Sequence, residues 1–134
     1  MTVYFYGRCS ADENFEKGSS VATQLSKAKA YAIIKNLTID KEITESISGT
    51  VRFYNRPMGL ELMNDLKKGD HVICSALDRF SRNTLDLLQT IEKFKRLKVN
   101  LHFAEFGNVT SADAIGSIFV KLLSVFAEFY SKQC

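Results

Sequence analysis

The first part of the chain alternates a short apolar run with a segment of helical periodicity. Residues 2–6 are β-branched and aromatic and end at Gly7, which predicts a buried strand. A polar stretch follows, and Ser19 or Ser20 is placed to cap a helix. The apolar residues that this helix would turn inward are Val21, Leu25, Ala28 and either Ile33 or Ile34. Residues 42–45 predict a second, weaker strand.

The same alternation continues beyond residue 50. Pro57 suits the first turn of a helix that would run to about residue 67, and the apolar residues 71–75 predict the central strand of a sheet. Residues 78–82 are expected to form a loop. Asn83 or Thr84 would cap the next helix, and residues 99–106 would return as a strand. The apolar positions of that helix are Leu85, Leu88, Ile91 and Phe94.

Strands that alternate with helices imply right-handed crossovers, so the fold class predicted is α/β, with a mainly parallel central sheet flanked by helices. The length of 134 residues fits one domain. Within it we expect an α/β core over residues 1–110 and a long helix over residues 111–134, where apolar residues recur at steps of three and four. This helix carries apolar residues outside its main stripe, which favours a subunit partner; the alternative is that it packs on its own core.

Composition narrows the class of protein. The chain is 46% hydrophobic and 25% charged, which is typical of a globular domain and excludes global disorder. The formal net charge of +3 is too small to indicate nucleic acid by itself. Its three cysteines show no CxxC spacing, so neither a disulfide framework nor a zinc site is predicted, and a cytoplasmic location is expected.

Membrane insertion and secretion are not expected. The longest apolar stretch, residues 112–129, contains Asp113, Lys121 and Glu128, which a membrane-spanning helix tolerates poorly. The first residues lack a basic start and a small-residue cleavage site.

Arginine is concentrated where an open α/β sheet binds its ligands. Of six arginines in the chain, Arg8 follows the first strand, Arg79 and Arg82 follow the central strand, and Arg56 precedes Pro57. Several guanidinium groups together indicate an anion such as phosphate. A hydroxyl among them, Ser10, could attack phosphorus, while Asp78 could orient an arginine or transfer a proton. The alternative is that each arginine makes an ordinary surface ion pair or cap.

Several motifs in this order resemble one family, the serine recombinases, which comprise the resolvases and DNA invertases, and specifically their N-terminal catalytic domain. The matching residues are Tyr6, Arg8 and Ser10; Gln24; Ser48-Gly49; Arg56-Pro57; Gly69-Asp70; Asp78-Arg79 with Arg82-Asn83; Ala114 to Gly116; and Phe126 to Phe129. Two features depart from the family pattern. The loop between Ser10 and Gln24 is longer, and Tyr130-Ser131 stands where Glu-Arg is common.

The resemblance implies an enzyme that breaks and rejoins DNA. Ser10 would attack a phosphodiester to give a 5′-phosphoserine link and a free 3′-hydroxyl, with no metal or nucleotide cofactor. The site residues that it implies are Ser10, Arg8, Arg56, Asp78, Arg79, Arg82 and Gln24. It also implies that the last helix builds a homodimer, which pairs into a tetramer. In the family this helix leads into a helix-turn-helix domain, and we do not expect that domain within these 134 residues.

Two other readings of the sequence remain open. The chain could be a non-catalytic module that dimerises through its last helix. It could also be a metal-dependent nuclease built on Asp70, Asp78 and Asp86, although their spacing does not force them together. Cys9 alternates with Arg8 along the first strand and is expected to be buried. His71 and His102 have no metal partner nearby in the sequence, so both are expected to be structural.

Overall fold

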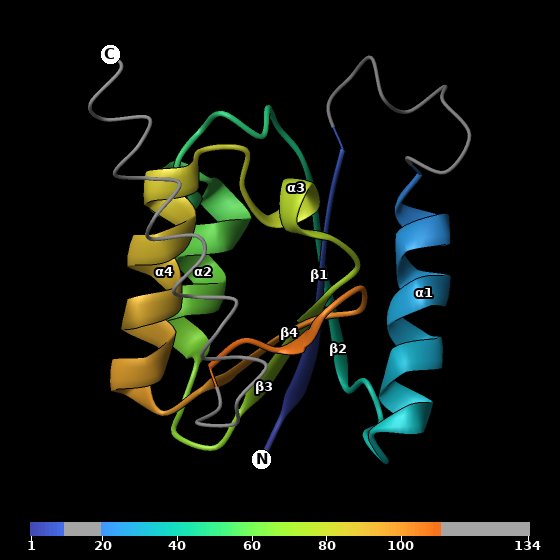
Figure 1. The fold of residues 1–134 in the computed structure, drawn as a ribbon. Coiled ribbons are helices and arrows are strands. Elements are labelled where there is room, and N and C mark those ends of the chain that lie inside the picture. The colour runs from blue at the N-terminus through green and yellow to red at the C-terminus, as the bar shows by residue number, and fades with distance from the viewer. Residues whose placement is uncertain (10–19, 111–134) are drawn as a thin grey trace.

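The computed structural model describes residues 1–9 and 20–110. In this part of the chain five strands form one sheet in the order β2-β1-β3-β4-β5 (Figure 1). The strands β1 (Val3–Cys9), β2 (Lys41–Ser46), β3 (His71–Cys74) and β4 (Asn100–Phe103) are parallel. The two-residue strand β5 (Gly107–Asn108) pairs with β4 in the antiparallel sense. The predicted fold class, α/β with a mainly parallel sheet, is confirmed.

The helices begin at the residues that the sequence marks as starts. Helix α1 (Val21–Ile34) is capped by Ser20, whose Oγ accepts from the Thr23 amide, and α2 (Pro57–Asp65) has Pro57 at its start. Helix α4 (Thr84–Leu97) is capped by Asn83. Two short elements complete the described chain, the 3₁₀-helix η2 (Phe53–Asn55) and the single-turn helix α3 (Leu77–Phe80).

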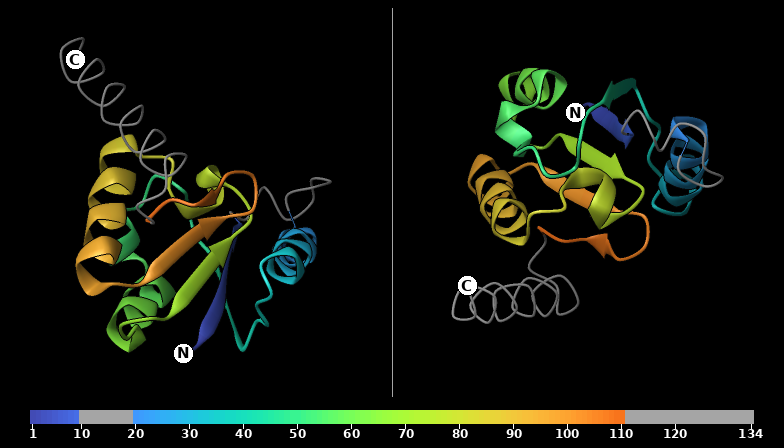
Figure 2. Two further views of the ribbon diagram at one scale, coloured as in Figure 1. Left: turned by 60° about the horizontal axis from the view of Figure 1, so that its bottom comes forward. Right: turned by 90° about the horizontal axis from the view of Figure 1, so that it is seen from above.

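The sheet is the middle of three layers. Helix α1 covers one face, while α2 and α4 cover the other (Figure 2, right). Strand β1 lies between β2 and β3, and all seven of its residues are buried. Successive side chains of a strand point to opposite faces, so Phe5 packs beneath α1 whereas Tyr4 and Tyr6 join the core under α2 and α4.

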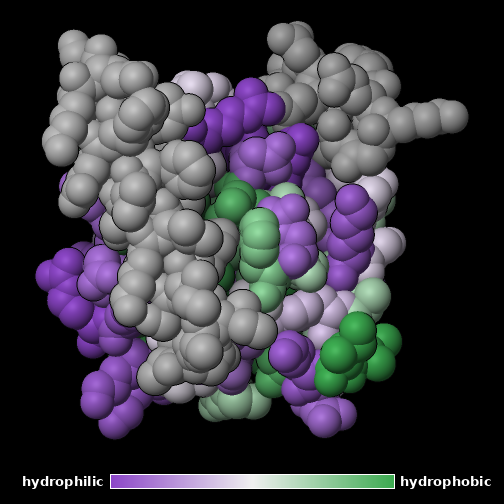
Figure 3. Space-filling model, in the orientation of Figure 1, coloured by the Kyte–Doolittle hydropathy of each residue, from purple (hydrophilic) through white to green (hydrophobic). Residues whose placement is uncertain are grey.

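The inward face of each long helix differs in part from the prediction. Ala28 is buried as predicted, but either Ile33 or Ile34 was also expected inward, and both are exposed, at 74% and 76%; Tyr31 and Ala32 are buried in their place. Ile33 lies five residues after Ala28, about 140° around the helix axis, so the two cannot face the same layer. The exposed pair forms part of a hydrophobic patch over the end of α1 (Figure 3).

Helix α4 shows the same kind of difference. Leu85, which was expected inward, is 54% exposed. The buried stripe consists of Leu87, Ile91 and Phe94, which follow one another at steps of four and three residues. Ile91 and Phe94 are buried as predicted, but Leu85 lies nine residues before Phe94, about 180° around the helix axis, and so faces away from this stripe.

The predicted ends of two strands and one loop were also wrong. Strand β1 does not end at Gly7 but continues to Cys9, and Gly7 packs so closely that a Cβ there would lie 2.7 Å from Phe5 Cζ. The expected strand 99–106 ends at Phe103; residues 104–106 form a turn, and Gly107, at φ 105°, begins β5. The expected loop 78–82 begins with the helical turn α3.

The predicted long helix over residues 111–134 lies outside the described residues. Within the described part, no helix has both the length and the apolar character needed to cross a bilayer.

Two histidines, the buried His102 and the half-buried His71, form a polar chain with Tyr31 on the α1 side of the sheet. His102 lies on β4, with Nδ1 2.7 Å from Tyr31 Oη and Nε2 2.8 Å from Nδ1 of His71 on β3. Burial, with smaller contributions from the neighbouring His71 and Lys35, lowers the pKa of His102 to about 4. These contacts join α1 to two strands.

The low pKa of His102 in this hydrogen-bonded chain predicts that the protein loses stability in mild acid. The unfolded His102 takes up a proton below about pH 6.5, whereas the folded side chain binds one only near pH 4, so lowering the pH favours the unfolded state. We expect His102 to account for a loss of about 2–3 kcal/mol between pH 7 and pH 4. Urea unfolding at a series of pH values should show that His102→Gln reduces this slope. Equal slopes for the variant and the parent would contradict the prediction.

Candidate active site at the switch point of the sheet

The sheet changes direction between β1 and β3. The chain passes from β1 to β2 on one side and then to β3 on the other, so the carboxyl ends of β1 and β3 flank the topological switch point. In open α/β sheets this is where ligands bind. The segments gathered here are the end of β1, the residues after β2 and the turn α3, over which the surface is hydrophilic (Figure 3).

Arg8, at the end of β1, has a fully buried side chain. Its guanidinium donates three hydrogen bonds to main-chain carbonyls: Nε to Arg79 at 3.1 Å, Nη1 to Ile47 at 2.9 Å and Nη2 to Asp78 at 2.7 Å. One positive charge therefore ties β1 to the segment after β2 and to α3. These bonds fix the main chain that carries Asp78 and Arg79.

Gln24 approaches Arg8 from α1, across the sheet. Its Nε2 donates to the Arg8 carbonyl at 2.8 Å, and its Oε1 accepts from the Arg8 amide at 3.1 Å. Gln24 is itself buried. The side-chain amide of Gln24 thus holds the main chain of β1 just before Cys9 and Ser10. It does so from the α1 side of the sheet, through the main chain of Arg8.

Arg56, the residue directly before α2, is also fully buried. Its Nη1 donates to Tyr6 Oη at 3.0 Å, and Tyr6 in turn donates to Glu45 Oε2 at 2.5 Å. Glu45 Oε1 accepts from the Met58 amide in the first turn of α2. Burial raises the pKa of Tyr6, so the hydroxyl keeps its proton and continues to relay this chain.

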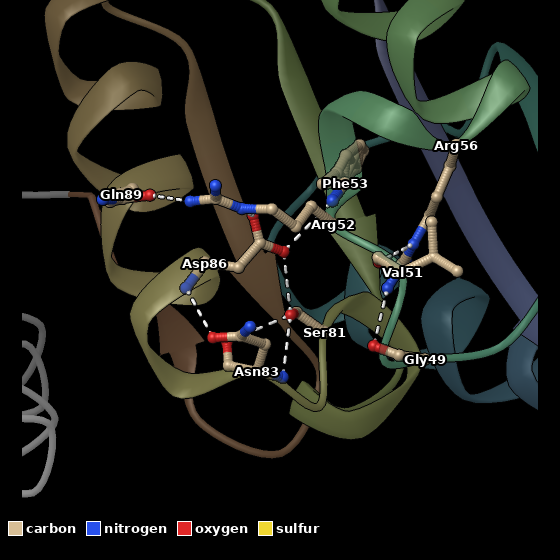
Figure 4. A network of polar contacts seen from close by, with 9 residues as sticks. All are labelled: Gly49, Val51, Arg52, Phe53, Arg56, Ser81, Asn83, Asp86 and Gln89. Atoms are coloured by element: carbon tan, nitrogen blue, oxygen red, sulfur yellow. Dashed lines mark hydrogen bonds and ion pairs between the residues drawn. The ribbon is translucent and has the colours of Figure 1, made fainter. Parts of the chain in front are cut away.

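The arginines meet at Gly49, which is buried. Its carbonyl accepts from Arg56 Nη2 at 3.2 Å and from the Arg82 amide at 3.0 Å; Figure 4 shows the first of these bonds. A methyl group on Gly49 would lie 2.8 Å from Arg82 Cγ and 2.9 Å from Arg8 Nη2. Glycine is needed here because three arginines approach one main-chain position.

The remaining polar residues lie nearer the surface. Arg79 and Asp78 are neighbours on α3, with Nε 3.7 Å from Oδ1, and Arg82 follows in the loop before α4. The side chain of Asp78 is 55% exposed and that of Arg79 is 12% exposed, while Arg82 is exposed. Two arginines therefore reach solvent at the switch point, and two lie beneath them.

The structure thus brings six of the seven expected site residues to one edge of the sheet. Ser10, the seventh, lies outside the described residues, and it follows Cys9, the last residue of β1. Cys9 is buried, as expected. Cys74, at the end of β3, is buried as well, and burial raises the pKa of its thiol to about 12, so it is a poor nucleophile.

The three aspartates considered for a nuclease have separate roles. Asp70 accepts from the amides of Thr2 and Lys67 at the amino end of the sheet, whereas Asp78 lies at the carboxyl end. Asp86 is buried in the first turn of α4. Within residues 1–9 and 20–110, no three His, Cys, Asp or Glu side chains are grouped as a metal site would require.

Sequence reasoning gave no role to Glu45, named Gly49 only within a matched motif, and considered Asp86 only as a metal ligand. Each acts through main-chain atoms or through a residue distant in the sequence, so spacing alone carries no signal for it. Gly49 has a weak signal, because it stands among polar residues within a matched motif.

An open α/β sheet with arginines gathered at its switch point is the arrangement that the sequence motifs predict for this domain. The profile of the resolvase N-terminal domain family matches residues 3–134. The chain belongs to this family.

Relatives of known sequence agree with this membership. The Tn2501 resolvase of Escherichia coli is 33% identical over 87 residues, which cover 65% of this chain and 45% of the relative. The Tn917 resolvase of Enterococcus faecalis is 29% identical over 126 residues, which cover 94% of this chain and 61% of the relative. The chain therefore spans about half to three-fifths of the length of these relatives.

Two solved structures are similar over nearly the whole chain. The N-terminal catalytic domain of TP901-1 integrase matches with a TM-score of 0.81 at 26% identity, and the match covers 99% of this chain and 98% of the other. A resolvase family site-specific recombinase from Streptococcus pneumoniae matches with a TM-score of 0.75 at 28% identity and covers 99% and 89%.

The contacts of Arg8 predict that it stabilises the fold strongly. Arg8→Met keeps much of the side-chain volume but leaves three carbonyl oxygens without their donor, so we expect unfolding to become easier by about 3 kcal/mol. Urea denaturation measures this difference. Arg96→Met, at an exposed position on α4, serves as the control and should change stability by less than about 0.5 kcal/mol. Equal effects of the two substitutions would contradict the structural role of Arg8.

Proposed function

We propose that the chain is the catalytic domain of a site-specific DNA recombinase and that Ser10 is its nucleophile. The observation that carries the proposal is the gathering of Arg8, Arg56 and Arg82 at Gly49, beside the end of the strand that leads into Ser10. Membership of the resolvase family supports the same reading. Such a site suits phosphoryl transfer, in which negative charge must be stabilised.

The four arginines would have different roles that depend on how deeply each is buried. Arg79 and Arg82 reach solvent and would contact the phosphate oxygens directly. Arg8 and Arg56 are buried with their donors bound to protein oxygens, so they would hold the walls of the site. Their fixed positive charges would also favour an anion from below, since charges interact more strongly away from water.

The reaction is a transesterification that conserves the bond energy. The Ser10 oxygen would attack phosphorus, a serine–phosphorus bond would form, and the bond from phosphorus to the 3′-oxygen would break. Ser10 loses one proton and the departing 3′-oxygen gains one, and we assign Asp78 a supporting role in this transfer. The reverse attack by a 3′-hydroxyl from another strand would reseal the DNA. No metal ion takes part in the proposed step.

Assembly would depend on residues 111–134. Their apolar periodicity suits a helix that pairs two subunits, and two such dimers would hold both DNA partners during exchange. Base recognition usually comes from elements that enter the grooves of DNA. The arginine site by itself would supply phosphate contacts.

The proposal predicts a covalent protein–DNA adduct. A labelled pool of short duplexes with randomised sequence and a central nick should yield an adduct that survives denaturing electrophoresis. Mass spectrometry should locate the modification on the peptide that contains Ser10. The adduct should form in excess chelator and be absent from Ser10→Ala, because that variant lacks the attacking oxygen.

Ser26→Ala provides a matched control. Ser26 is an exposed serine on α1 and belongs to none of the matched motifs, so its loss should leave adduct formation unchanged. Adduct formation by Ser10→Ala at the parental level would refute the assignment of the nucleophile. Absence of any adduct from the parent would favour a non-catalytic module, and an adduct lost with chelator would contradict metal independence.

Arg79 and Arg82 would contact phosphate, so we predict DNA binding that depends on salt. Retention of the chain on DNA should fall as salt rises from about 50 to 200 mM, because each phosphate contact releases counterions. Arg82→Gln should lower the slope of log affinity against log salt by about one unit. Fluorescence anisotropy with a labelled duplex measures both quantities. Retention that does not change with salt would count against a phosphate-binding site.

A further inference from the structure

We infer that Asp86 is a positioning residue that holds the segments carrying Arg56 and Arg82 in register with one another. This inference rests on the proposed function, because it concerns the same arginine site. Asp86 lies in the first turn of α4, and its side chain is only 1% exposed. It does not belong to the set of residues that the sequence motifs implied.

One carboxylate oxygen of Asp86 binds two segments that are far apart in the sequence. Oδ2 accepts from the Phe53 amide at 3.1 Å and from Ser81 Oγ at 3.0 Å. Figure 4 shows Asp86 pointing from α4 between η2 and the loop that contains Ser81. Phe53 begins η2, three residues before Arg56, and Ser81 directly precedes Arg82.

The two segments meet again at Gly49. The Arg56 Nη2 and the Arg82 amide both donate to the Gly49 carbonyl. The Asp86 carboxylate and the Gly49 carbonyl therefore link the same pair of segments at two points. Two links resist rotation of one segment against the other, whereas a single link would act as a hinge.

The hydrogen bonds, and not the ion pair, carry this role. Arg52 lies with Nε 3.8 Å from Asp86 Oδ1, but its side chain is 51% exposed and it also donates to Gln89. An ion pair with so exposed a partner contributes little. The amide of Phe53 and the hydroxyl of Ser81 are bound to a buried charged oxygen, and such bonds are stronger than those between neutral groups.

This geometry predicts different outcomes for an isosteric substitution and for a truncation of Asp86. In Asp86→Asn, the amide oxygen can occupy the place of Oδ2 and accept both hydrogen bonds, while the amide nitrogen faces Arg52. In Asp86→Ala, both bonds are lost: the buried Phe53 amide loses its acceptor, and the Ser81 hydroxyl keeps only the Asn83 carbonyl, 3.1 Å away. A positioning role through Oδ2 therefore predicts that Asn preserves the site and that Ala disrupts it.

The first test needs no DNA. Hydrogen exchange measured by NMR should show that Asp86→Ala accelerates exchange of the Arg82 amide and of the Arg56 Nε–H by about tenfold or more relative to amides of α1. Asp86→Asn should remain within about threefold of the parent at both groups. Parental exchange rates at both groups in Asp86→Ala would overturn the inference.

The second test measures the rate of adduct formation at temperatures where thermal unfolding shows every variant folded. At saturating DNA, Asp86→Ala should form the adduct about a hundredfold more slowly, with the half-saturating DNA concentration within about threefold of the parent, because misplaced groups slow the chemical step. Asp86→Asn should restore the rate to within about threefold. A purely structural role would lower the melting temperature of Asp86→Ala and leave the rate of the folded protein unchanged, which would refute the inference.

Further variants keep both tests decisive. If Asp86→Ala does not fold, Ser81→Ala removes one of the two bonds and should accelerate exchange at Arg82 while leaving Arg56 as in the parent; no change at Arg82 would overturn the inference. Glu92→Gln, at a half-exposed position on the same helix, is the matched control and should match the parent. A parent that forms no adduct would refute the proposed function alone, because the exchange experiment still tests Asp86.

Discussion

The site depends on the hydrogen bonds that the buried guanidinium of Arg8 donates to the main chain. A charge removed from water is tolerated only where its donors are satisfied, and here three main-chain carbonyls from two separate segments satisfy them. The segment after β2 and the turn α3 are therefore held against the end of β1. The fold is built around a positive charge at the edge where its chemistry would take place.

Close approach at Gly49 makes this arrangement possible. The absence of a side chain allows Arg8 and Arg82 to come within van der Waals distance of the main chain, and its carbonyl binds Arg56 and Arg82. Behind this layer, Gln24 holds the main chain of Arg8, and Glu45 connects Tyr6 to the start of α2. Arg79 and Arg82 thus lie above a layer of buried polar contacts that restricts movement of the main chain carrying them.

The sequence was most informative where a local rule decides the structure. Ser20, Pro57 and Asn83 marked the starts of three helices, because capping and proline geometry depend on neighbouring residues alone. It was less informative about single helix positions and about strand ends. Ile33, Ile34 and Leu85 are exposed although they are apolar, and Gln24, Asp86 and Thr90 are buried although a hydrophobic pattern assigns polar residues to solvent.

By itself the sequence determined the alternation of strands and helices, the parallel sheet and the concentration of arginines near strand ends. These features follow from periodicity and from residue types at fixed spacing. Only the tertiary structure decided that Arg8 and Arg56 are buried while Arg79 and Arg82 reach solvent, and that one oxygen of Asp86 serves both Phe53 and Ser81. The physical reason is that burial and shared hydrogen bonds depend on contacts between segments tens of residues apart, which no local pattern records.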